Sequence, residues 1–550
     1  MGGQFNTDIV EAVIIGAGVT TVICSINDLT SSVGLIIVYM LALFIQLTWR
    51  EATEEISYCY DLILRPSSSS GILLGSVLLP LVIISTQSSQ YNSSSIHLTD
   101  DDGNNLAASC LVFSIACLLC VWLTRCKMSV TVLERLISVR WVVSWVAVMV
   151  ILHKVPLQGV VALAVSFGGS VTCVWFLLGL LYVLEESFTI GEAMVVAQGL
   201  TLLTLEAVNT TVYHTGRELI ACLQVLILGG IIIGLTMKPV LQKMPTIYSI
   251  NVSRGKHKQQ GNGANHSNRI QDIPRPFSWK LTAFFYIAIA ASIICILLPW
   301  LGIMIKSWPL LFGLKFTLMT SEKRTCLVFI WAGLISTAIT MVFWLQTSST
   351  VTRKYFHLFT VAAFLPGIYF DVELVFLATA GTFFIAILLE FFRIHQVWPL
   401  GEALQSASQT LGDAQDTGVI FLSHLYLLLG LAVPVWLYTG VHGYHIESTL
   451  PLFSGVLSVG IGDTAASVIG SKYGVIKWPG TKKTILGTVS AILFQIPACY
   501  LLSYIGILPS MASHFFSISW AIVLTSLLEA FTLQIDNLVL PLFMYCLLVT

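Results

Sequence analysis

The chain has 550 residues, of which 56% are hydrophobic and only 10% are charged. Its mean hydropathy is +0.87. So few charged side chains cannot cover a water-soluble globule of this size, and the composition therefore indicates an integral membrane protein. The 27 basic and 28 acidic residues nearly cancel and are spread over loops and helix ends, so nucleic acid is not an expected partner.

Hydrophobic runs that are long enough to cross a bilayer recur along almost the whole chain. A helix needs ~20 residues to cross a hydrocarbon core of ~30 Å. The sequence predicts an all-α, polytopic fold with about 14 to 17 transmembrane helices. The expected spans lie near residues 8–26, 32–49, 71–86, 106–125, 138–153, 158–184, 191–208, 218–237, 281–304, 325–346, 355–371, 373–391, 419–439, 450–470, 487–508, 515–531 and 538–549.

One long hydrophilic segment divides these spans into two groups. Residues 238–280 hold eight Lys or Arg against a single acid, Asp272. The positive-inside rule places such a segment in the cytosol. We therefore divide the chain into an N-terminal transmembrane region, 1–237, this cytosolic loop, and a C-terminal transmembrane region, 281–550.

Counting helices onward from this loop places the polar groups of the C-terminal region on one side of the membrane. Residues 353–354, 393–418 and 472–486 fall in the cytosol, and Glu529 and Asp536 return to the same face. One loop disagrees with the positive-inside rule. The helix count places the basic residues of this loop in the lumen: Lys306, Lys315, Lys323 and Arg324.

A Gly-rich hydrophobic run, 454–470, opens into a basic loop, 471–486, that has the composition of a nucleotide site. Glycines let a backbone approach a ligand closely, threonine and main-chain N–H groups donate to phosphate oxygens, and lysines add point charges. The alternatives are a positive-inside anchor loop and, for the glycines, close packing of helices. The residues expected to bind a nucleotide are Gly460, Gly462, Ser471, Lys472, Tyr473, Gly474, Lys477, Trp478, Pro479, Gly480, Thr481, Lys482, Lys483 and Thr484.

Four acids near the ends of apolar runs are candidates for metal binding or proton transfer. An ionised carboxylate is costly inside a membrane unless it is paired or bound to a metal. Asp463 is the first choice for a Mg²⁺ ligand, and a pair with a lysine inside the bundle is its alternative role. Glu529 and Asp536 complete the expected metal set, while Asp416 is the preferred base and Asp536 a second metal-binding or orienting group.

Two histidines and a basic pair have simpler interpretations. His357 and His424 lie within or at the edge of predicted helices, where a histidine more often packs or hydrogen-bonds than binds a ligand. Arg353 and Lys354 lie at a cytosolic helix end, where basic residues usually set topology, and contact with phosphate is the alternative. The sequence has no Walker A motif, no protein-kinase Gly-rich loop and no Rossmann fingerprint, which argues against a soluble-type ATP kinase.

The order GVLSVGIGDTAASVIGSKYGVIKWPGTKKTILGT, residues 455–488, closely resembles the signature of the dolichol kinase family of CTP-dependent polyprenol kinases. The resemblance covers roughly the last 200 residues, and the first half matches mainly in hydrophobic character. Further matching motifs are residues 353–358, 366–368, 416–418, 424–430, 529–531 and 534–537. Many relatives carry a glutamate where this chain has Leu486.

The resemblance implies an enzyme of the endoplasmic reticulum membrane whose site faces the cytosol. It implies transfer of the γ-phosphate of CTP, with Mg²⁺ or another divalent cation, to the terminal hydroxyl of dolichol, in support of protein N-glycosylation. Lys482 and Lys483 are then assigned to the β- and γ-phosphates. The alternatives are a kinase of phytol or diacylglycerol, a cytidylyltransferase that makes a CDP-lipid, and a multi-helix transporter. The sequence does not indicate the oligomeric state.

Overall fold

The fold is helical wherever the structure, a computed structural model, describes the chain. The described residues are 2–26, 28–49, 64–65, 69–93, 101–125, 158–213, 217–241, 279–344, 350–411, 416–443, 450–508 and 514–550. Within these ranges the only β-pairing is an isolated antiparallel bridge between Lys477 and Thr484. The predicted all-α fold is confirmed. The predicted span 138–153 and most of the predicted loop 238–280 lie outside the described residues.

Long apolar helices make up both halves of the chain. Among the described residues, 12 helical stretches are long and apolar enough to cross a membrane, and shorter apolar helices accompany them. In a bilayer core a helix satisfies all of its backbone hydrogen bonds internally, which is why such sequences fold this way. The N-terminal helices are α1 (Gly2–Ser25), α2 (Leu29–Trp49), α4 (Ile72–Ser93), α5 (Asp101–Arg125), α8 (Gln158–Val183), α9 (Ile190–Tyr213) and α10 (Glu218–Leu241).

The C-terminal half adds helices of several kinds, including π-helical segments within the spans. They are α12 (Trp279–Ser292), η1 (Ile293–Leu297), α13 (Leu298–Ile305), α14 (Pro309–Leu314), η2 (Lys315–Met319), α15 (Glu322–Trp344), α16 (Thr350–Phe370), α17 (Val372–Ile394), α18 (Leu400–Leu411), α19 (Leu422–His442), η3 (Leu450–Phe453), η4 (Val456–Asp463), α20 (Thr464–Tyr473), α21 (Ile485–Tyr504), α22 (Phe515–Phe531) and α23 (Asp536–Val549). Each predicted span within the described residues corresponds to a helix or, for 281–304 and 450–470, to consecutive helical segments, with ends that are shifted by a few residues. The sequence prediction missed α14 and α18.

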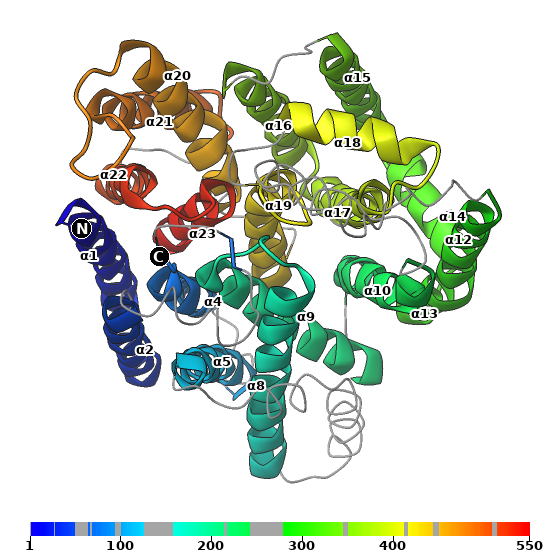
Figure 1. Ribbon diagram of the computed structural model, residues 1–550, viewed down its shortest axis with the longest axis horizontal. Helices are drawn as coiled ribbons and strands as arrows, with labels where there is room; N and C mark the ends of the chain where they lie inside the picture. Colours follow the sequence, from blue (N-terminus) through cyan, green and yellow to red (C-terminus); the bar gives the residue numbers. More distant parts are fainter. Residues whose placement is uncertain are drawn as a thin grey trace, which may run out of the picture.

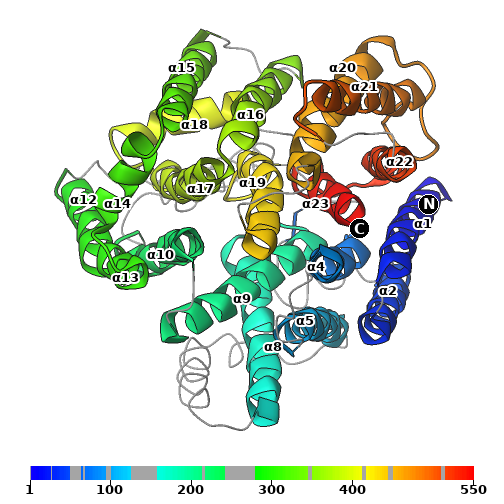
Figure 2. The same ribbon diagram turned by 180° about the vertical axis from the view of Figure 1, so that it is seen from behind.

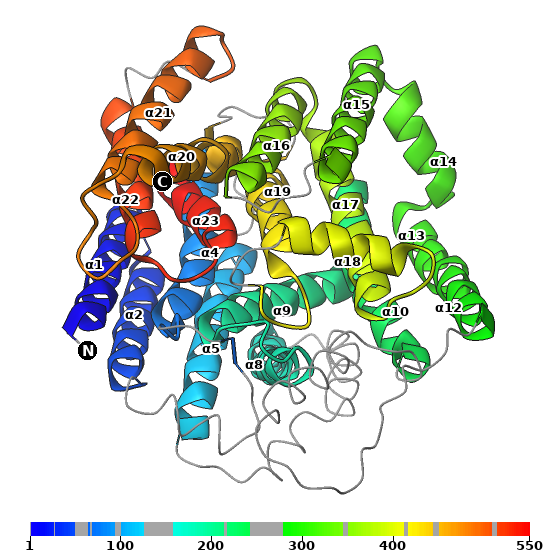
Figure 3. The same cartoon turned by 45° about the horizontal axis from the view of Figure 1, so that its top comes forward.

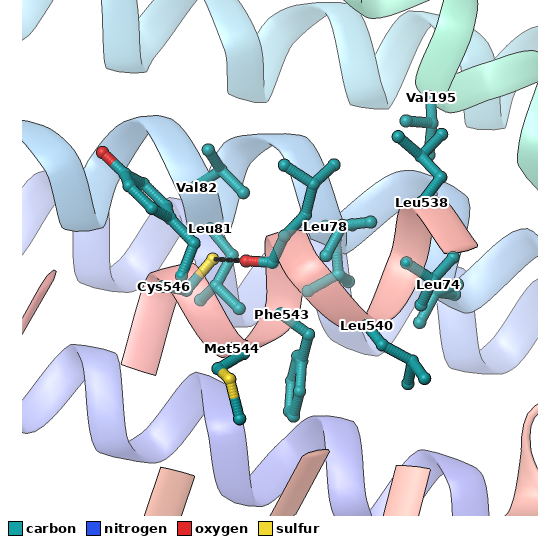
Figure 4. Packing of buried hydrophobic residues seen from close by; sticks show 14 of the residues in the cluster. Leu74, Leu78, Leu81, Val82, Val195, Leu538, Leu540, Phe543, Met544 and Cys546 are labelled. Atoms are coloured by element: carbon teal, nitrogen blue, oxygen red, sulfur yellow. Dashed lines mark hydrogen bonds between the residues drawn. The ribbon is translucent and has the colours of Figure 1, made fainter. Parts of the chain in front are cut away.

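The last helix of the chain packs against an N-terminal helix at the centre of the molecule. In Figures 1 and 2, α23 lies beside α4, with α19 on its other side. Figure 4 shows the α4 side chains Leu74 and Leu78 alongside α23, while Phe543 of α23 points away from them, toward α1, where Gly18 leaves room for its ring. Both helices are apolar on all faces, the composition of a helix that is buried in a protein core. The two halves of the chain therefore share one hydrophobic core.

The outer helices differ from α4 in what they expose. In α4, 89% of the membrane-length window is buried, against 11% in α15. The exposed α15 side chains include Phe329 and Ile335, which suits a face against lipid. Helix α18 runs across the ends of α15 and α17 instead of along the bundle (Figure 3). Its apolar and polar residues fall on opposite faces of the helix, as is typical of an amphipathic helix at a membrane surface.

The loop that disagrees with the positive-inside rule, residues 306–324, contains a positive charge that is neutralised inside the protein. Arg324, at the start of α15, forms hydrogen-bonded ion pairs with Asp371 at 2.6 Å and with Glu373 at 3.1 Å. Asp371 separates α16 from α17, and Glu373 lies in the first turn of α17. Only 5% of Arg324 is exposed. Because it is already paired and buried, Arg324 contributes little to the positive charge that sets topology.

Candidate functional site

The loop 474–484 between α20 and α21 folds into a tight hairpin. The Trp478 N–H donates to the Lys483 carbonyl at 3.0 Å, and the Ile485 N–H donates to the Ile476 carbonyl at 2.9 Å. Gly480 at the tip has φ of +77°, a left-handed conformation that glycine adopts without a steric penalty. Thr484 ends the loop and caps α21, since its Oγ1 accepts from the Gly487 N–H at 3.1 Å.

Contacts with α20, α21 and α22 hold this hairpin in place. The Trp478 indole N–H donates to Thr488 Oγ1 at 2.9 Å, and its ring lies 5.3 Å from the Phe531 ring. A Cβ added to Gly470 or Gly474 would come within 2.7 Å or 2.5 Å of Thr484 Oγ1. These glycines therefore allow α20 and the hairpin to approach closely.

Asp463 forms the first of two ion pairs at the site. It ends the π-helical segment η4, and only 2% of it is exposed. Its carboxylate pairs with the Lys354 ammonium of α16, and His357 Nε2 lies 3.8 Å from the same oxygen. Segments of π-helix are frequent at functional sites. The alternative role for Asp463, pairing with a lysine inside the bundle, is thus observed.

Lys483 forms the second ion pair, with Glu529 near the end of α22. Only 4% of Glu529 is exposed, whereas 42% of the Lys483 side chain remains accessible. Burial by itself lowers the pKa of Lys483, but the negative charges of Glu529, Asp536 and Asp463 outweigh it and raise the pKa above its ordinary value. Lys483 is therefore a stable cation facing three carboxylates.

Asn537 connects the remaining acids to this group. Its side-chain amide donates to the Ser423 carbonyl at 3.3 Å, and its Oδ1 lies 3.4 Å from His357 Nε2. Its backbone N–H donates to Asp536 Oδ1 at 2.9 Å. The Ser423 N–H in turn donates to Asp416 Oδ1 at 3.1 Å. A continuous set of contacts therefore runs from the Asp463 pair to Asp416.

The structure thus brings together residues that are far apart in sequence. Asp463 lies where η4 continues into α20, and the other predicted acids lie at or near helix ends. The predicted carboxylates Asp463, Glu529 and Asp536 gather around the ammonium group of Lys483. Asp416 is connected to this group through Ser423, whose N–H it accepts. Lys482, next to Lys483, is exposed. The remaining exposed members of the predicted nucleotide loop are Ser471, Lys472, Tyr473, Lys477, Pro479 and Gly480, and Thr481 is partly buried.

The two predicted glycines of η4 have a clear packing role. A Cβ at Gly460 would lie 2.3 Å from Val361 Cγ2, and one at Gly462 would lie 2.5 Å from Gln495 Nε2. Each position therefore accommodates a neighbouring helix, as small residues do in membrane bundles. Binding of a nucleotide by Gly460 and Gly462 stays a prediction.

Sequence reasoning missed two members of the site. For Lys354 the sequence indicates a topology anchor or a phosphate contact, and neither interpretation predicts that its side chain is largely buried and paired with Asp463. Asn537 received no role of its own, although its side-chain amide connects His357 with Ser423 and its backbone N–H donates to Asp536. The available signal was the presence of both residues in the motifs 353–358 and 534–537. His424 lies on α19, in the turn after Ser423.

The carboxylates suit a metal that arrives with phosphates. Among the residues described, no group of three or more His, Cys, Asp and Glu is arranged to hold a metal by protein ligands alone. Mg²⁺, however, is usually held by one or two carboxylates together with substrate phosphates and water. Asp463, with Glu529 or Asp536 nearby around Lys483, fits that requirement.

These features define a multi-pass helical membrane protein with a site of paired lysines and carboxylates at the helix ends. A family model described as dolichol kinase matches residues 274–426. The chain is 33% identical to the dolichol kinase of Mus musculus over 388 residues, which cover 67% of this chain and 66% of the mouse protein. It is 29% identical to a dolichol kinase of Arabidopsis thaliana over 530 residues, 88% of each chain. The chain belongs to the dolichol kinase family.

The similarity extends further than the motifs suggested. A dolichol kinase of Saccharomyces cerevisiae is 28% identical over 241 residues, 43% of this chain. The much longer Arabidopsis alignment necessarily includes N-terminal helices, so the similarity is not confined to the last 200 residues. No solved structure matches the chain.

Proposed function

We propose that the protein transfers the γ-phosphate of CTP to the terminal hydroxyl of dolichol, giving dolichyl phosphate and CDP. The observation that carries this proposal is the convergence of Lys483, Lys354 and three carboxylates beside a loop with phosphate-binding composition. The reaction takes place at the cytosolic face of the endoplasmic reticulum membrane and supplies the lipid carrier for protein N-glycosylation. A long isoprenoid stays in the bilayer while the nucleotide stays in water, so the site has to lie at their boundary.

In this proposal the two ion pairs are exchanged when the substrates bind. Phosphoryl transfer depends mainly on positioning and on neutralising the phosphate charge. Lys482 and Lys483 contact the β- and γ-phosphates, while hydroxyl and main-chain donors of the hairpin orient them. Asp463, with Glu529 or Asp536, would hold Mg²⁺, which when bound would neutralise phosphate charge. In the complex with substrates, the lysines would pair with phosphates and the carboxylates with Mg²⁺, instead of with each other.

The acceptor side of the site is assigned to Asp416 and Asp536. A bond forms between the dolichol oxygen and the γ-phosphorus, the bond from that phosphorus to the bridging oxygen breaks, and CDP leaves. The hydroxyl proton passes to Asp416, whose orientation is fixed by the Ser423 N–H at 3.1 Å. Asp536, held by the Asn537 N–H at 2.9 Å, orients the acceptor or completes the metal site.

Purified protein incubated with dolichol and labelled CTP tests this proposal directly. Label from the γ position of CTP is expected in the lipid product, and label from the α position in CDP. Transfer of the α label to the lipid would instead indicate a cytidylyltransferase. Equal or faster labelling of phytol or diacylglycerol would assign a different lipid alcohol. Absence of any lipid label, with CTP and Mg²⁺ present, would contradict kinase activity.

A further inference from the structure

The corner between α8 and α9, residues 184–192, contacts two separate segments of the candidate site. The first is the segment 416–420, which begins with Asp416. The Val419 N–H donates to the Glu185 carbonyl at 3.4 Å, and the Ile420 N–H donates to Ser187 Oγ at 3.3 Å. The packing is tight, because a Cβ added to Gly418 would lie 2.3 Å from Ser187 Oγ and 2.5 Å from the Ser187 backbone nitrogen.

The same corner also holds the connection between α22 and α23, residues 532–535, which separates Glu529 from Asp536. The Ile535 N–H, directly before Asp536, donates to Glu192 Oε1 at 3.1 Å. The Thr189 hydroxyl donates to the Gln534 side-chain carbonyl. A backbone N–H between two helices has no partner within either helix, so a carboxylate from a third helix fixes its position.

Glu192 is itself held rigidly. Its second oxygen accepts from the Thr189 N–H at 3.2 Å, its carboxylate pairs with the Arg65 guanidinium, and only 4% of it is exposed. The Arg65 N–H donates to the Phe188 carbonyl at 3.0 Å, which ties Arg65 to the corner as well. A buried charge pair with several hydrogen bonds permits little displacement, because any loss of contact leaves a charge unpaired.

We propose that the α8–α9 corner positions the two acceptor-side carboxylates of the site, with Arg65, Thr189 and Glu192 as positioning residues. This inference rests on the proposed function. It gives the N-terminal half a specific task, since one rigid corner sets the relative placement of the segments that carry Asp416 and Asp536. A displacement of ~1 Å at a reacting group can reduce a rate by ~10²-fold, so residues that touch no substrate can control kcat.

Thr189→Val is the principal test because it removes the hydroxyl that reaches Gln534 while keeping the side-chain shape. We expect kcat for dolichol phosphorylation to fall at least ~10-fold, with KM for CTP within ~3-fold of the wild type. The nucleotide loop keeps its own anchors through Trp478, which is why KM should change little. Thr189→Ser retains the hydroxyl and is expected to restore kcat to within ~3-fold.

Gly418→Ala tests the other contact of the corner, and Gly440→Ala is its matched control. Both add one methyl group, but the added Cβ of Gly440 has nothing within 4 Å. Neither glycine has a positive φ, so the substitutions differ in the clash with Ser187. Gly418→Ala should lower kcat and leave KM for CTP unchanged, whereas Gly440→Ala should match the wild type. A merely structural role predicts wild-type kcat per folded molecule in both Thr189→Val and Gly418→Ala, and that result would overturn the proposal.

Amide hydrogen exchange separates this inference from the proposed function, because it requires no activity. In Thr189→Val and Glu192→Gln the amides of residues 417–423 and 535–537 should exchange at least ~10-fold faster, while those of the hairpin 474–484 stay unchanged. Unchanged exchange in both segments would overturn the inference even if the wild type phosphorylates dolichol. If the wild type transfers no phosphate but the two segments exchange faster, the proposed function fails and the corner still holds them.

Discussion

Lys354→Met separates a structural from a functional role of the Lys354–Asp463 pair. Methionine keeps the apolar stem of lysine and removes the ammonium. Asp463 is 2% exposed and the Lys354 side chain 13% exposed, so the pair lies largely out of water. Removing one partner of a buried pair typically costs about 3–5 kcal/mol, because the other charge is left uncompensated. His357, at 3.8 Å, would compensate only when protonated.

The double variant Lys354→Met/Asp463→Asn removes both charges and completes a cycle. Loss of both partners should restore most of the stability, since no buried charge then remains unpaired. Activity should behave differently. If Lys354 and Asp463 act on phosphate and metal, the single variants should lose about 10²–10³-fold in kcat/KM, and the double variant should not recover.

Thermal unfolding in detergent measures the stability of the four proteins in this cycle, and CTP-dependent labelling of dolichol measures their activity. Activity is expressed per folded molecule, so a lower folded fraction does not appear as lost catalysis. Recovery of stability together with activity in the double variant would refute the reasoning, because the pair would then only hold α16 against η4. Full activity in Asp463→Asn alone would remove Asp463 from the metal site.

Three further predictions concern the hairpin and its side of the membrane. Lys483→Ala should lower kcat/KM for CTP by about 10²-fold, whereas Lys323→Ala, at an exposed position in the first turn of α15, should leave it unchanged; equal losses would indicate a general charge effect. The pKa of Lys483 is raised above its ordinary value. The stabilisation by its ion pair with Glu529 is therefore fully present below the ordinary pKa of lysine and is lost only as the pH rises through the higher pKa of the folded state. Wild type and Lys483→Arg should therefore share one pH profile from roughly pH 8 to 10, and a lower alkaline limb in the wild type alone would contradict this. Finally, Val475→Cys, at a site that is 89% exposed, should react with an impermeant thiol reagent in intact microsomes, and Lys323→Cys only after permeabilisation; the reverse pattern would invert the assigned topology.

The sequence predicted the helices well because membrane insertion is a local requirement. Any run of ~20 apolar residues has to be helical to satisfy its backbone, whatever its neighbours are. The elements that were missed are those to which this rule does not apply. Helix α14 (Pro309–Leu314) is too short to span a bilayer, and α18 (Leu400–Leu411) is too polar.

The candidate site was predicted only in part, for the same physical reason. A glycine-rich run followed by Trp478, Pro479 and adjacent lysines is local information, so the hairpin could be located from its residues. The partner of each charge is not local. Lys354 is separated from Asp463 by 109 positions, and no periodicity indicates which of the scattered lysines compensates that acid.

By itself the sequence determined that this chain is a helical membrane protein and located a basic loop after a glycine-rich run, since composition and short motifs fix both. Only the tertiary structure decided that Lys354 belongs to the site. It also decided that a corner of the N-terminal half holds the segments of Asp416 and Asp536. Charges buried in an apolar bundle need partners, and those partners come from whichever helices packing brings near.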